Sequence, residues 1–60
     1  MEICDIKRWL NKLVGYKGHR YIFNGVVLRK NEKEFFYQAE LKDVKSNSLV
    51  ICRLEDVKIE

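Results

Sequence analysis

Residues able to bind a metal or perform catalysis are few and widely spaced in this chain of 60 residues. Cys4 and Cys52 belong to no C-x-x-C pair, and the one histidine is His19. Structural zinc takes four converging ligands, so these three groups predict no metal site, and no other cofactor is expected. We expect both cysteines to be small buried residues, and a disulfide between them would be unusual in a reducing compartment.

Catalytic groupings are missing as well. His19 has no serine, cysteine or acid at a spacing that would orient it as a general base. Glu55 and Asp56 are adjacent, and neighbours in a turn point in different directions, which indicates a solvated turn. Gly15 and Gly18 lack the preceding strand and the lysine-hydroxyl pair of a phosphate-binding loop. The sequence therefore predicts neither enzymatic activity nor a small-molecule substrate.

Positive charge is concentrated in the first half of the chain. Residues 1–33 hold eight Lys/Arg and three acids, a balance of +5, and residues 34–60 hold four and six, a balance of −2, which sums to the net +3. Basic groups interleaved with aromatic ones are typical of nucleic-acid surfaces, on which phosphates pair with cations and bases stack. The candidate residues for this contact are Lys17, Arg20, Arg29 and Lys30 for phosphates, with Tyr16 and Tyr21 for stacking.

The element that opens the chain is predicted to be an amphipathic helix over residues 3–14. Its apolar positions recur at steps of three and four, which is the period of one helix face. They are Ile3, Ile6, Leu10, Leu13 and Val14. Trp9 is expected to cover an open end of a sheet, and Gly15 is placed to end the helix in a left-handed conformation.

The rest of the chain alternates with the period of two that indicates strands, predicted at residues 19–30, 35–44, 49–54 and 57–60. The run 49–54 is mostly apolar at successive positions, which predicts a strand buried on both faces. Asn24-Gly25 has two readings. It is either the turn of a two-residue hairpin, which would oppose Arg20 to Arg29, or a bulge that bends one long strand.

Three successive aromatic residues begin the second strand. Phe35 and Tyr37 share a face by alternation and are expected in the core. Phe36 then points outward together with Gln38, and these two residues are the candidate protein interface.

This order of elements, with the turn at residues 54–57 before a final strand, resembles the small SH3-like barrels, including the Sm-like branch. The resemblance implies an α+β fold in which a short N-terminal helix packs on a strongly bent antiparallel sheet of four to five strands. Members of this class bind nucleic acids, peptides or one another. The sequence carries none of the family's signature motifs, so no functional residue is transferred.

Residues 1–60 are expected to form one domain that acts as a non-enzymatic binding module. Its expected role is protein-protein assembly, as a homo-oligomer or an accessory subunit, and the alternative is nucleic-acid binding through the basic first half. No apolar run has the length of a membrane span, and the N-terminus lacks a signal-peptide pattern, so a cytoplasmic location is expected. A composition rich in lysine and asparagine and without proline favours a bacterial or phage origin.

Overall fold

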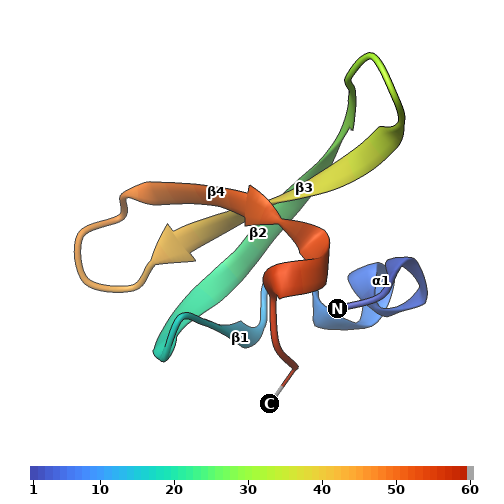
Figure 1. Ribbon diagram of the computed structural model, residues 1–60. Helices are drawn as coiled ribbons and strands as arrows, with labels where there is room; N and C mark the ends of the chain where they lie inside the picture. Colours follow the sequence, from blue (N-terminus) through green and yellow to red (C-terminus); the bar gives the residue numbers. More distant parts are fainter. Residues whose placement is uncertain (60) are drawn as a thin grey trace.

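The fold is an antiparallel sheet of four strands that curls into a half-barrel behind a short helical segment (Figure 1). The computed structural model describes residues 1–59. The elements are η1 (Ile3–Asp5), α1 (Ile6–Trp9), β1 (Leu13–Tyr16), β2 (His19–Lys30), β3 (Phe35–Asp43), β4 (Leu49–Arg53) and η2 (Leu54–Asp56). Each strand pairs with the next along the chain, in the order β1-β2-β3-β4. The predicted α+β class and the bent antiparallel sheet are confirmed.

The helix is shorter than predicted. It ends at Trp9, and Asn11 takes a positive φ of 66°, a conformation that stops a helix and that asparagine tolerates well. Leu13 and Val14, predicted on the apolar helix face, instead pair with β2 as part of β1. Gly15 lies within that strand, so its predicted role at the helix end is wrong. None of the helical segments within residues 1–59 is long and apolar enough to cross a membrane.

The two-residue hairpin turn is formed by Lys17 and Gly18, between β1 and β2. Both residues have positive φ, 48° and 78°, as a type I′ turn requires, and the flanking Tyr16 and His19 are paired. Asn24-Gly25 is therefore not a hairpin turn, and the prediction of a bulge at this position is confirmed. The register between β2 and β3 shifts between Phe23 and Gly25, so a bulge bends one continuous strand of 12 residues.

The end of the described chain returns to the first strand. Gly15 and Lys58 exchange two backbone hydrogen bonds, both 2.8 Å long, and the nitrogen of Met1 donates to the carbonyl of Val57 at 2.6 Å. The predicted strand 57–60 is thus reduced to a single bridge at Lys58. Glu60 lies outside the described residues.

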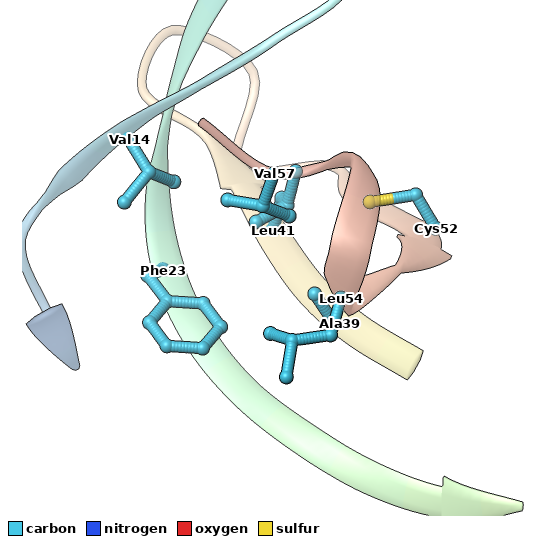
Figure 2. Close-up of a cluster of buried hydrophobic side chains, with 7 residues drawn as sticks. All are labelled: Val14, Phe23, Ala39, Leu41, Cys52, Leu54 and Val57. Atoms are coloured by element: carbon cyan, nitrogen blue, oxygen red, sulfur yellow. The ribbon is translucent and has the colours of Figure 1, made fainter. Parts of the chain in front are cut away.

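The core fills the concave side of the half-barrel (Figure 2). Each strand and the segment after β4 contribute to it, and its buried members are Val14, Phe23, Ala39, Leu41, Cys52, Leu54 and Val57. Ile6 and Trp9 of α1 pack against this cluster, so the helical segment covers it as expected for Trp9. The predicted core residue Phe35 is 66% exposed, because it lies near the tip of the β2–β3 hairpin, past the end of the pairing with β4.

Polar side chains close the two longer turns. Oδ1 of Asn31 accepts hydrogen bonds from the backbone nitrogens of Lys33 and Glu34, at 2.8 and 2.7 Å. Oδ1 of Asp43 accepts from Lys45 and Ser46 in the same manner. These N–H donors, with the nearby charges of Lys45 and His19, lower the pKa of the Asp43 carboxyl. Both turns lie between strands that the sequence predicts at residues 19–30, 35–44 and 49–54.

Truncation of the core aromatic is expected to remove most of the stability. Phe23→Ala deletes a fully buried ring and should cost about 3–5 kcal/mol. The total free energy of unfolding of a domain of this size is roughly 3–9 kcal/mol. Phe35→Ala is the matched control and should change the unfolding free energy by about 0.5 kcal/mol or less. Urea denaturation measures both, and equal losses would contradict the observed placement of the two rings.

The two thiols are expected to differ in reactivity. Both cysteines are free; Cys4 is exposed, contrary to the prediction that both are buried, and Cys52 is buried. Burial, with a contribution from Asp56, raises the pKa of the Cys52 thiol, which lowers the fraction of reactive thiolate. In native protein, a disulfide-exchange reagent at pH 8 should react rapidly with one thiol per chain. Cys4→Ser should abolish this rapid phase, and its survival in that variant would refute the assignment.

Candidate interaction surfaces

The convex side of the sheet carries a group of aliphatic side chains over which no other element of residues 1–59 packs. The cross-strand register places five of them on this side, and we call them the outer apolar face: Leu13, Ile22, Val27, Leu49 and Ile51. Leu13, Leu49 and Ile51 are 43, 56 and 49% exposed. Several exposed aliphatic groups on one side of a small protein mark an interaction surface more often than isolated ones do.

Strand β4 is the reason that this face is uncovered. Its apolar run predicts burial on both sides, but only Cys52 is buried, and the side chains of Leu49 and Ile51 point to the convex side. β4 is also the last strand of the sheet, and its five residues contain no proline and no lysine. Proline, lysine and bulges are the common means by which edge strands avoid pairing with other chains.

Two charged residues of β3 lie between the aliphatic groups. Lys42 is paired with Leu49 and with Ile22, and Glu40 is paired with Ile51, so both side chains are on the convex side. Opposite charges two residues apart make this part of the face complementary to a second copy related by a two-fold axis.

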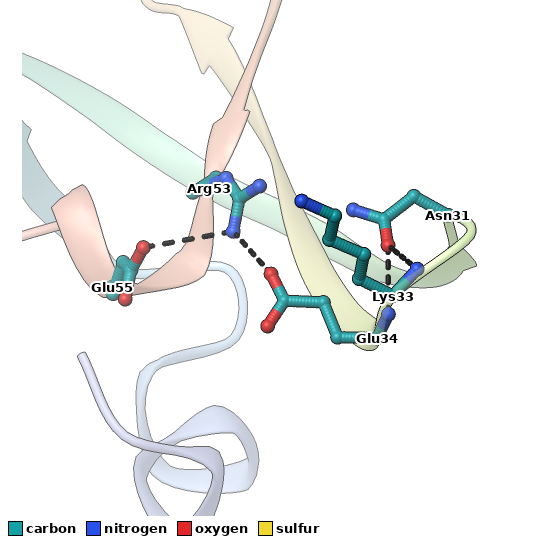
Figure 3. A network of polar contacts seen from close by, with 5 residues as sticks. All are labelled: Asn31, Lys33, Glu34, Arg53 and Glu55. Atoms are coloured by element: carbon teal, nitrogen blue, oxygen red, sulfur yellow. Dashed lines mark hydrogen bonds and ion pairs between the residues drawn. The ribbon is translucent and has the colours of Figure 1, made fainter.

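The predicted interface residues Phe36 and Gln38 lie on the same side, next to this face. Phe36 is half-buried because the guanidinium of Arg53 covers its ring at 4.4 Å from the centroid. Arg53 also makes ion pairs with Glu34 at 3.6 Å and Glu55 at 3.8 Å (Figure 3). The outward orientation predicted for Phe36 agrees with the register, while the more exposed aromatic is Phe35.

The predicted nucleic-acid residues divide into two groups at opposite ends of β2. At the β1–β2 turn, the rings of Tyr16 and Tyr21 lie 6.3 Å apart and the Nζ of Lys17 is 5.4 Å from the Tyr16 centroid. Arg20 is paired with Gly15 beside them. Both tyrosines also pack against the core, which leaves only part of each ring for stacking.

Arg29 and Lys30 lie at the far end of the strand. Nine residues separate Arg20 from Arg29, which is roughly 30 Å along a strand. The hairpin that would have brought them together does not form, because Asn24-Gly25 is a bulge. Lys30 lies instead over the ring of Phe35, with Nζ 5.6 Å from the centroid.

Sequence reasoning missed most of the outer apolar face. Leu13 was assigned to the helix, and Leu49 and Ile51 to a strand buried on both sides. The signal that could have found them is the length of the chain, because 60 residues cannot cover both sides of a four-stranded sheet. Within residues 1–59, no three His, Cys, Asp or Glu side chains are grouped so as to hold a metal ion.

Comparison of the chain with protein-family models, with curated proteins and with solved structures gives no match. The structure has three candidate interaction surfaces. They are the outer apolar face, the β1–β2 turn with Lys17 and Arg20, and the surroundings of Arg53.

Proposed function

We propose that this protein is a non-enzymatic assembly module of SH3-like barrel architecture whose outer apolar face binds a second copy of the same chain. The observation that carries the proposal is the exposure of Leu49 and Ile51 on an edge strand whose sequence is typical of a buried one. Burial of such side chains is the main favourable term in protein association.

The surface area of the monomer supports this proposal. Its accessible surface is 4665 Å². A compact protein of 7.2 kDa would expose roughly 4,100 Å², so this chain exposes roughly 500 Å² more. A standard interface buries about 800 Å² per partner. The excess is thus a large part of what a dimer would bury, although the projecting β2–β3 hairpin contributes to it as well.

The charges on the face favour a second copy over an unrelated partner. The side chains of Glu40 and Lys42 lie among the aliphatic groups and have opposite signs. A two-fold axis near them would place Glu40 of one copy against Lys42 of the other. A strongly acidic or basic partner would instead repel one of the two residues. The long apolar stem of Lys42 can also cover neighbouring aliphatic surface.

The proposal predicts a dimer that one substitution dissociates. Sedimentation equilibrium at about 100 µM should give twice the 7.2 kDa chain mass. Ile51→Lys places a charge within the contact, and a loss of about 2 kcal/mol of association free energy would weaken association about 30-fold. Leu28→Lys is the control, because Leu28 is equally exposed but lies on the other side of the sheet. A monomeric wild-type protein, or equal effects of the two substitutions, would contradict the proposal.

A second candidate function is binding of single-stranded nucleic acid at the β1–β2 turn. The contact of Lys17 with the ring of Tyr16, which itself lies beside the ring of Tyr21, favours this function, since cations beside aromatic faces suit phosphates and bases. Arg29 and Lys30 are too distant to join this site.

Fluorescence anisotropy with a labelled 12-nucleotide oligo(dT) tests the second candidate. With the two phosphate contacts that Lys17 and Arg20 could supply, binding should weaken roughly sevenfold between 50 and 200 mM salt. Lys17→Ala should weaken binding severalfold, and Lys33→Ala, at the opposite end of the molecule, should not. Salt-independent binding, or no binding at 50 mM salt, would exclude this function.

A further inference from the structure

A groove with a volume of about 310 Å³ lies where β4 leaves the sheet. Its walls come from three segments of the chain, residues 1–3, residues 34–37 at the start of β3, and residues 53–55 at the junction of β4 and η2. It is separate from the outer apolar face, since none of the five residues of that face lines it.

The floor of the groove is an unpaired stretch of sheet edge. β4 pairs with β3 only as far as Arg53 opposite Gln38, and the chain then turns into η2. Residues 35–37 of β3 pair with β2 on one side and have no β4 partner on the other. Strand residues direct their N–H and C=O groups alternately to the two sides, so at least one of these three residues presents both groups to the groove.

The side chains around this edge differ on its two sides. Phe35 lies on the concave side by register, and Ile3, which also lines the groove, is another large exposed apolar residue. The outward side is acidic, with Glu34 and Glu55 held to Arg53 by ion pairs. Glu2 is a third acid in the lining. These three acids and one arginine give the groove side chains a charge of −2, and with the α-ammonium of Met1 the lining is still negative, at −1, in a chain of net +3.

We propose that this groove binds an extended peptide segment of a partner protein, in which apolar and basic residues alternate, by adding it as a strand beside residues 35–37 of β3. Main-chain hydrogen bonds to the open edge would hold such a segment, and the alternation of a strand would sort its side chains. Its apolar side chains face Ile3 and Phe35, and its basic side chains face Glu34 and Glu55.

Arg53 does not block this arrangement. Its two ion pairs are 3.6 and 3.8 Å long and join partly exposed side chains, and exposed ion pairs of this kind contribute little stability. A lysine or arginine of the incoming strand can therefore replace Arg53 on the carboxylates, while Arg53 keeps its contact with the ring of Phe36.

Amide chemical shifts of the full-length ¹⁵N-labelled protein test the proposal. The probe is a soluble hexapeptide of alternating lysine and valine, compared with the matched hexapeptide of glutamate and valine. The lysine peptide should shift the amides of residues 1–3, 34–37 and 53–55, and the glutamate peptide should bind at least tenfold more weakly. Every second backbone N–H of the bound peptide would donate to β3. A lysine peptide that is N-methylated at those nitrogens should not bind.

Two variants with the same net charge provide the control. Glu34→Lys should weaken binding of the lysine peptide at least tenfold. Glu32→Lys, in the adjacent turn and outside the groove lining, should change the affinity for this peptide less than twofold. Equal effects of the two variants, equal binding of both peptides, absence of binding, or shifts centred on Leu49 and Ile51 would each overturn the proposal. The outer apolar face is not part of this test, so the Ile51→Lys variant should still bind the peptide.

Discussion

The short chain determines how this structure is packed, because a four-stranded sheet has two sides and 60 residues can cover only one of them. A chain of this length buries only about 60% of the surface that its unfolded form exposes. The short helix, η2 and the strand ends all cover the concave side, where the seven buried hydrophobic side chains lie. The convex side keeps its aliphatic groups in contact with solvent, and the proposed self-association follows from that imbalance.

The bend in β2 distributes the remaining surfaces. With a bulge between Phe23 and Gly25, β2 continues as one strand to Lys30, and the tip of the β2–β3 hairpin projects past the end of β4. This projection leaves Phe35 exposed and opens the sheet edge that forms the floor of the groove. It also separates Arg20 from Arg29, which divides the basic residues of the first half into two distant groups.

Much of the sheet could be predicted from the sequence, since alternation and polar turns mark β2, β3 and β4 to within one residue at most ends. The helix was predicted too long because Leu10, Leu13 and Val14 fit a period of 3.6 as well as they fit a short strand. Only tertiary pairing with Tyr21 and Ile22 decides between these conformations. Local signals likewise could not show that Lys17-Gly18, and not Asn24-Gly25, turns the chain, or that the face of Ile51 stays uncovered.

The proposed self-association requires that the convex side of the sheet contacts the convex side of a second molecule. A mixture of ¹³C-labelled and unlabelled protein, examined by isotope-filtered nuclear Overhauser spectroscopy, reports only contacts between copies. The account predicts intermolecular cross-peaks among the methyl groups of Leu13, Leu49 and Ile51. Their absence at millimolar concentration, or cross-peaks confined to concave-side residues such as Leu28 and Phe35, would contradict it.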